Sequence, residues 1–316
     1  MSRPLNFCLV TGGAGFIGSH LVHTLLEHGA SVRILDNFTS GTRGNLHGVE
    51  NRIEVMEGDV RDTATCHEAC SGASTVFHLA ALVSVPESVE QPHKAHEINI
   101  GGTLNILMAA RESGVGRVVF SSSSAVYGDT RTLPTPEDTL PVPASPYGLQ
   151  KLCGEHYCRL FYQLYGLETV SLRYFNVFGA RQNPDSAYAA VIPRFLRRLH
   201  TGQHPTVYGD GEQTRDFLHV SDVARANVLA ATVVQEAAIG SVFNIAGGDG
   251  TSLNQLLDLM RKALGVNIAA VHEPPRIGDI RHSVASTIRA ASLLEFIPHL
   301  TLSDGLALTA QSYRDT

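Results

Sequence analysis

The sequence predicts an α/β fold in which a doubly wound parallel sheet is joined to a smaller, discontinuous α/β domain. Short apolar segments recur through the first half of the chain, at residues 7–10, 31–35, 53–56, 75–79, 117–122 and 169–175. Helix-like segments lie between them, among them residues 15–28, 93–113 and 147–165. This alternation indicates a parallel sheet with helices on both faces.

The alternation loosens after about residue 177, where Pro184, Pro193 and Pro205 interrupt it. It resumes with a helix at 221–233, which Ser221 would cap, a buried strand at 241–246 and an amphipathic helix at 253–264. We therefore expect the chain to return to the first domain. The predicted domains are residues 1–176 plus 216–246 and residues 177–215 plus 247–316.

The composition argues against several classes of protein. The chain has 316 residues, of which 43% are hydrophobic, and this is enough to build a sizeable core. The net charge of −6 argues against a nucleic-acid partner, and no apolar run reaches the ~18 residues of a membrane span. Five cysteines are an odd number, and neither they nor the 15 histidines follow a metal-site spacing. We expect a cytoplasmic protein without metal or membrane contact.

A glycine-rich segment follows the first predicted strand and opens the first predicted helix. It reads Thr11-Gly12-Gly13-Ala14-Gly15-Phe16-Ile17-Gly18. Glycines let backbone N–H groups approach a pyrophosphate, and the helix N-terminus favours its negative charge. An ordinary turn can also be rich in glycine, but the strand before it and the helix after it favour a dinucleotide site.

Asp36 ends the second predicted strand, 18 residues after Gly18, the last of these glycines. A carboxylate there can accept hydrogen bonds from the adenosine ribose and would repel a 2′-phosphate, which predicts NAD rather than NADP. Asp59 ends the third strand, where it could reach the adenine. Small residues after His78 leave room for the cofactor at the end of the fourth strand.

Tyr147 and Lys151 stand one helical turn apart and therefore on one face of a helix. A Lys ammonium, together with a positive nicotinamide, would favour the phenolate of a Tyr that serves as a base. Such a pair is often only a surface contact. Here the serines 121–124 end the fifth strand, at the edge of the sheet where ligands bind, and a Ser there can hydrogen-bond the same substrate oxygen.

These residues resemble those of a known family, the extended short-chain dehydrogenases/reductases. Within it the chain is similar to NAD-dependent nucleotide-sugar epimerases of the UDP-glucose/UDP-N-acetylglucosamine 4-epimerase type. The resemblance covers nearly the whole chain and implies a Rossmann-type sheet. It rests on residues 11–18, 36–38, 58–60, 78–81, 99–103, 121–128, 145–151, 173–179, 215–217 and 278–279.

The resemblance implies a role for each matching residue. The implied catalytic residues are Ser123, Tyr147 and Lys151. Tyr147 and Lys151 would also contact NAD, as would Gly12, Gly15, Phe16, Ile17, Gly18, Asp36, Asn37, Asp59, Val60, Leu79, Ala80, Ala81, Asn99 and Tyr174. The implied substrate contacts are Ser84, Ser123, Ser124, Asn176, Ala190, Val191, Tyr208, Arg215, Arg276, Asp279 and Ser283.

The implied reaction inverts C4 of a UDP-sugar through a transient 4-keto sugar, while the protein grips the UDP firmly and the sugar loosely. Dehydratases of the family carry an Asp-Glu pair, and decarboxylases a Glu, where this chain has Ser124 and Ala125. Another NAD-dependent nucleotide-sugar enzyme, namely a UDP-glucuronate epimerase, a dehydratase or a decarboxylase, stays an alternative, and so does a non-catalytic NAD-sensing protein on the same fold.

Two further expectations come from the resemblance. Ser283 stands where epimerases restricted to plain hexoses carry Tyr, so its small side chain suggests that UDP-N-acetylhexosamines are accepted; Val83 replaces a Lys found in some hexose epimerases. The family commonly forms homodimers through helices that correspond to 93–113 and 147–165. Leu104, Leu107, Met108 and Leu152 offer apolar surface for such a contact.

Overall fold

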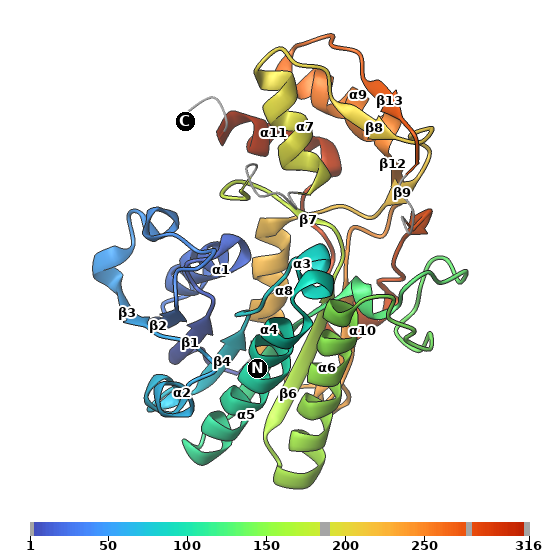
Figure 1. Ribbon diagram of the computed structural model, residues 1–316. Helices are drawn as coiled ribbons and strands as arrows, with labels where there is room; N and C mark the ends of the chain where they lie inside the picture. The colour runs from blue at the N-terminus through green and yellow to red at the C-terminus, as the bar shows by residue number, and fades with distance from the viewer. Residues whose placement is uncertain (1–2, 184–189, 276–279, 313–316) are drawn as a thin grey trace.

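The structure is a computed structural model that describes residues 3–183, 190–275 and 280–312 (Figure 1). Its centre is a seven-stranded sheet in the order β11-β6-β5-β4-β1-β2-β3, and every neighbouring pair is parallel. The strands are β1 (Phe7–Thr11), β2 (Ser31–Asp36), β3 (Ile53–Glu57), β4 (Thr75–His78), β5 (Arg117–Ser123), β6 (Glu168–Tyr174) and β11 (Val242–Ile245). The predicted doubly wound sheet is confirmed.

Helices cover both faces of this sheet, which explains why its strands are apolar runs rather than alternating ones. One face packs against α1 (Phe16–Glu27), α8 (Val220–Thr232) and α10 (Ile288–Leu294). The other packs against α2 (Thr63–Cys70), α5 (Gly102–Glu112) and α6 (Pro146–Tyr165). The order of the strands reverses between β1 and β4, and a crevice opens at such a point at the carboxyl ends of the strands.

A second unit, at the top of Figure 1, has its own core between α7 (Val191–His200), α9 (Leu253–Leu264) and α11 (Leu302–Ser312). Phe195, Leu256 and Leu306 lie in that core. Its short strands pair in twos and threes: β9 (Thr214–Arg215) lies between β12 (Thr251–Ser252) and β14 (His282–Ser283), β8 (Thr206–Tyr208) pairs with β13 (Val271–Glu273), and β7 (Val177–Phe178) pairs with β10 (Leu218–His219). Ser252 caps α9 through a capping box.

The chain passes between the two units several times. After the first part of the second unit, α8 packs against the sheet and β11 joins its edge beside β6. The chain then returns again, because Ala290 and Leu294 of α10 and the following Phe296 are buried in the core beside α1 and α8. Residues 288–296 therefore pack with the first unit, although their position in the sequence predicted the second. The rest of the domain division stays a prediction.

Two local predictions differ from the structure. The helix expected at 93–113 is divided into α4 (Pro92–His96), a π-helical turn at Glu97–Gly101, and α5. A shorter helix, α3 (Val85–Glu90), precedes it. Helix α8 begins one residue earlier than expected and is capped by His219, whose Nδ1 accepts the N–H of Ser221. Ser221 is therefore inside the helix, and its predicted role as the cap is wrong.

The described part of the chain contains no helix with the length and hydrophobicity that crossing a membrane requires. The same residues hold no group of three or more His, Cys, Asp or Glu side chains arranged for a metal ion. All five cysteines are described, and all are free thiols.

Candidate active site

The glycine-rich loop between β1 and α1 needs glycine at two positions because backbone passes very close to them. Gly12 has a φ of +70°, and a Cβ there would lie 2.9 Å from the backbone nitrogen of Ala80. A Cβ on Gly18 would lie 2.1 Å from the carbonyl oxygen of Gly12. The loop is therefore folded tightly against the end of β4, at the point where the strand order reverses.

The first turn of α1 has no side-chain cap, unlike the first turns of α2 and α6. Gly15 is the N-cap and offers no side-chain acceptor, whereas Asp62 caps α2 and Ser145 caps α6. Phe16 and Ile17 of the first turn are only partly buried. Their N–H groups and the positive end of the helix are suited to a pyrophosphate, so this cradle fits the diphosphate of NAD.

Asp36 lies at the end of β2, directly beside this loop. Its Oδ2 accepts the N–H of Ala14 at 2.9 Å, and its Oδ1 accepts the N–H of Phe38 at 2.8 Å. Burial raises the pKa of the carboxyl, and these two hydrogen bonds act in the opposite direction. Each oxygen keeps a lone pair for a further donor, which fits the predicted contact with a ribose.

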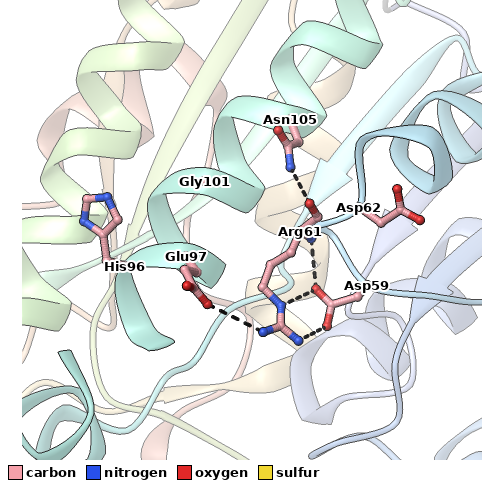
Figure 2. Close-up of a pocket in the computed structure, with 7 residues that line it drawn as sticks. All are labelled: Asp59, Arg61, Asp62, His96, Glu97, Gly101 and Asn105. Carbon is pink, nitrogen blue, oxygen red and sulfur yellow. Dashed lines mark hydrogen bonds and ion pairs between the residues drawn. The ribbon is translucent and has the colours of Figure 1, made fainter. Parts of the chain in front are cut away.

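Asp59 faces an open cavity of about 650 Å³, but its carboxylate is already fully engaged (Figure 2). Oδ1 accepts the N–H and Nε of Arg61, both at 2.9 Å, and Oδ2 accepts Nη2 of Arg61 and Nδ2 of Asn37, both at 2.8 Å. These contacts lower the pKa of Asp59 to about 2. Four donors fill the four lone-pair positions of a carboxylate, so an adenine amino group would have to displace one of them.

A buried histidine fixes the end of β4. Nδ1 of His78 lies 2.7 Å from Oγ1 of Thr11, and Nε2 lies 3.0 Å from Oγ1 of Thr103. Burial lowers the pKa of His78 to about 3. The ring is therefore neutral, and it links β1, β4 and α5 beside the half-exposed residues Ala80 and Ala81.

The three predicted catalytic side chains meet where β5 and α6 approach each other. Ser123 ends β5; its hydroxyl accepts the N–H of Ala125 at 3.2 Å and lies near the Tyr147 hydroxyl, where it acts to lower the pKa of Tyr147. Nζ of Lys151 lies 6.0 Å from the centre of the Tyr147 ring and donates to the carbonyl oxygen of Ser121 at 2.7 Å. Sequence spacing predicted this grouping, and the structure brings it together.

Burial has opposite effects on the two titratable groups of this cluster. It raises the pKa of Tyr147, although the Ser123 hydrogen bond acts against the rise. It lowers the pKa of Lys151 to about 8. Tyr147 is therefore a neutral phenol at neutral pH, suited to donating a proton. Nearby positive charge is needed before it can act as a base.

Asn99 was predicted to contact the cofactor, but its carboxamide is occupied by protein groups. Its Oδ1 accepts the N–H of Leu82 at 2.8 Å, and its Nδ2 donates to the carbonyl of Leu82 and to Oε1 of Gln150. The π-helical turn places Asn99 in this pocket, and Gln150 lies between Tyr147 and Lys151 on α6. Gln150 was not predicted from the sequence. Its position directly before Lys151 was the one feature that could have indicated a place near the site.

Tyr174 has a similar arrangement at the end of β6. Its hydroxyl donates to Oδ1 of Asn227 on α8 at 3.0 Å and also contacts Ser121. The ring belongs to the core beneath the sheet. A cofactor contact would therefore have to use the ring rather than the bound hydroxyl.

A second cavity, of about 240 Å³, opens beside Ser123 and holds several predicted substrate residues. Arg215 and Ser283 are paired neighbours on β9 and β14. The remaining lining comes from the turn that follows β5, the segment after β6, the chain from residue 127 to 135 and residues at or just before β14. The full lining is Ser124, Ala125, Tyr127, Gly128, Thr130, Thr135, Phe175, Asn176, Arg215, Ile280, His282 and Ser283.

The other predicted substrate residues are not part of this lining. Ser84 caps α3, Ala190 and Val191 begin α7, and Tyr208 ends β8. Val83 is exposed at the surface. Arg276 and Asp279 lie outside the described residues. His282 and Thr130, which line the cavity, were not predicted, because nothing in the sequence places the loop beyond residue 127 against β14.

Comparison with known proteins finds relatives along nearly the whole chain. The sequence model of the NAD dependent epimerase/dehydratase family matches residues 8–246. A UDP-glucose 4-epimerase of Mycolicibacterium smegmatis is 39% identical over 311 residues, which are 97% of this chain and 98% of that protein.

Two solved structures have the same fold over nearly their full lengths. A UDP-N-acetylglucosamine 4-epimerase from Methanobrevibacter ruminantium, in complex with UDP-N-acetylmuramic acid, has a TM-score of 0.94 and 38% identity, and covers 99% of each chain. A UDP-glucose 4-epimerase of Thermus thermophilus, in complex with NAD, has a TM-score of 0.88 and 36% identity, with 98% of this chain and 99% of that chain covered.

Proposed function

The chain belongs to the NAD-dependent epimerase/dehydratase family, and we propose that it is a UDP-sugar 4-epimerase that inverts C4 through a transient 4-keto sugar. The observation that carries this proposal is that Ser123, Tyr147 and Lys151 lie together directly beside Ser124, which lines the second cavity. Next to it stand Ser124 and Ala125, which cannot serve as the additional acid or base that dehydration or decarboxylation of the sugar needs.

NAD, when bound, supplies the acceptor and then the donor of the hydride at C4. Its pyrophosphate fits the first turn of α1, and Asp36 suits its ribose. Tyr147 then removes the proton from the sugar 4-OH and later returns one to the same oxygen, with Ser123 hydrogen-bonded to that oxygen. The Lys151 ammonium, held by the carbonyl of Ser121, favours the phenolate of Tyr147 while it lasts.

Inversion requires the sugar to present both faces to one acid–base pair. Arg215 is suited to holding the diphosphate, since a guanidinium binds phosphate oxygens in two places. The side chains of Ser124, Ala125 and Ser283 are small, so the part of the cavity beside them leaves the sugar room to turn. Arg215 would thus bind the UDP firmly, while the small side chains would leave the sugar loosely bound.

The proposal is tested by incubating the purified protein with UDP-glucose, UDP-N-acetylglucosamine and their uronic acids, without added cofactor. We expect the C4 epimer to appear, as followed by NMR of the anomeric protons. A 4-keto-6-deoxy sugar would indicate a dehydratase, and release of CO₂ from a uronic acid a decarboxylase. The absence of any product from a protein that retains NAD would favour a sensing role.

Asp36 should determine cofactor choice. A 2′-phosphate beside this carboxylate would cost about 1–4 kcal/mol of repulsion, so we expect at least roughly fivefold preference for NAD over NADP. Asp36→Ser should reduce the ratio of the NADP dissociation constant to the NAD dissociation constant. The measurement is the dissociation constant of each cofactor for the protein freed of endogenous NAD, with a thermal melt to confirm that the variant folds. NADP in the protein as purified would contradict the prediction.

We also propose that the protein is a homodimer that pairs through α5 and α6, which lie side by side in Figure 1. Leu107 is buried in the monomer's core and is not available for this contact, contrary to the expectation from sequence; Leu104 and Met108 are partly buried there. Leu149, Leu160 and Leu164 instead form an exposed row along one face of α6.

This row gives a direct test of the dimer. Leu164→Glu would place a charge in the contact, and we expect it to convert the protein to monomers. Sedimentation velocity measures the change. Val234→Glu is the control, because Val234 is equally exposed but lies after α8. A wild-type protein that sediments as a monomer would contradict the dimer.

A further inference from the structure

Asp216 is a fully buried carboxylate at one of the points where the chain passes from the second unit back to the first. It follows Arg215 of β9 and stands two residues before β10. The N–H of Gly247 donates to its Oδ1 at 2.7 Å, the N–H of Gly248 donates to both oxygens at 3.2 and 3.1 Å, and the N–H of Ala285 donates to Oδ2 at 3.1 Å. One side chain therefore serves three backbone groups.

These three donors come from two other passages between the units. Gly247 and Gly248 follow β11 of the sheet and lead to β12, and Ala285 follows β14 and leads to α10. With its own position before β10, Asp216 connects three passages of the chain at one point. The geometry requires glycine there, because a Cβ on Gly247 would lie 2.9 Å from the carbonyl oxygen of Phe217 and 3.1 Å from Oδ1 of Asp216.

The connected segments also carry the side chains that line the second cavity. Arg215 immediately precedes Asp216, and Ser283 stands two residues before Ala285. The two are register partners on β9 and β14, and this pairing is only two residues long. So short a ladder gives little stability by itself. A buried charge with four hydrogen bonds next to it is the stronger constraint on both strands.

We propose that Asp216 is a positioning residue, which holds Arg215 and Ser283 at a fixed place relative to the cofactor-binding sheet. The proposal rests on the proposed function only for the identity of the ligand, a nucleoside diphosphate held by Arg215. Asp216 itself is sealed in the protein and touches neither substrate nor cofactor. Its effect is therefore expected on diphosphate binding, and not on the acid–base step at Tyr147.

The chemistry of this position requires a carboxylate. Asn has nearly the same shape, but it offers one acceptor oxygen and turns an NH₂ group toward backbone N–H donors. At least one backbone N–H then stays buried without a hydrogen-bond acceptor, and this destabilises the folded arrangement around Asp216. Asp216→Asn should therefore loosen the junction that Asp216 forms with residues 247, 248 and 285, without changing the volume of the buried side chain. Gly247→Ala disturbs the same junction independently, because the added Cβ pushes against Asp216 and Phe217.

The experiment measures binding of UDP by titration calorimetry at pH 8.5, above the pKa of about 7 to which burial raises this carboxyl. We expect Asp216→Asn and Gly247→Ala to weaken UDP binding by about tenfold or more. Retention of NAD should stay within about twofold, and the substrate KM should rise much more than kcat falls. Asp249→Asn is the matched control, since Asp249 is a neighbouring but exposed carboxylate.

Hydrogen exchange gives a readout that does not depend on substrate. In either variant the amides of residues 247, 248 and 285 should exchange faster, while those of β1 and β4 stay protected. Unchanged UDP affinity in both folded variants, or equal losses of UDP and NAD binding, would overturn the proposal. If wild-type protein does not bind UDP, the proposed function fails instead. The hydrogen-exchange measurement then tests by itself whether Asp216 holds residues 247, 248 and 285 in place.

Discussion

We expect Tyr147→Phe to lower kcat by about 10³-fold while leaving the fold and the bound NAD in place. Tyr147 lies in the first turn of α6, and phenylalanine keeps its buried ring, so only the hydroxyl near Ser123 is removed. The Lys151 ammonium donates to the carbonyl of Ser121, so we do not expect it to take over the proton transfer that the Tyr147 hydroxyl performs. The measurement is steady-state epimerisation, with NAD content determined after denaturation.

The matched control is Tyr157→Phe, which removes a hydroxyl from the same helix outside the cluster. We expect this variant to keep wild-type turnover. A Tyr147→Phe protein with wild-type rates would exclude Tyr147 as the acid and base. Loss of NAD from the variant would instead show that the hydroxyl serves binding, since the rate would then recover on adding cofactor.

Ser283→Tyr should suppress epimerisation of UDP-N-acetylglucosamine and spare that of UDP-glucose. Ser283 lines the second cavity with Ser124 and Ala125, so a tyrosyl ring there would take the space that an N-acetyl group needs. Overpacking of this kind costs about 1–3 kcal/mol, which corresponds to roughly 5–150-fold in kcat/KM. Plain hexoses lack the added group and should lose less than about threefold.

Ser283→Ala is the control for this experiment, because it removes the hydroxyl and adds no volume. We expect both substrates to be turned over at nearly wild-type rates. The comparison is the ratio of kcat/KM for the two sugars in each variant. Equal losses on both sugars, or no loss on either, would mean that Ser283 does not determine substrate size.

Sequence reasoning predicted the parts of this protein that local pattern determines. Each predicted strand of the sheet is present within one or two residues, because a strand buried on both faces is a continuous apolar run. The glycine-rich loop and the spacing of Tyr147 and Lys151 are equally local. The π-helical turn was missed because it depends on Asn99 fitting between Leu82 and Gln150, which come from other parts of the chain.

Long-range contacts explain the remaining differences. Nothing near Ile288 in the sequence indicates that α10 packs beside α1, since its few apolar residues suit either unit. Asp59 has the expected place just after β3, but its full set of donors depends on Asn37, which follows the neighbouring strand β2. The same holds for Asp216, whose partners lie 31 to 69 positions away.

The repeated passage of the chain between the two units has a consequence for synthesis on the ribosome. Once residue 176 has been made, six strands of the sheet exist, but α8, β11 and α10, which complete one face, are still missing. Residue 296 follows after roughly ten seconds at ordinary translation rates. During that time the nascent chain exposes an apolar sheet face and the unpaired edge of β6, a state that attracts chaperones and is prone to aggregation.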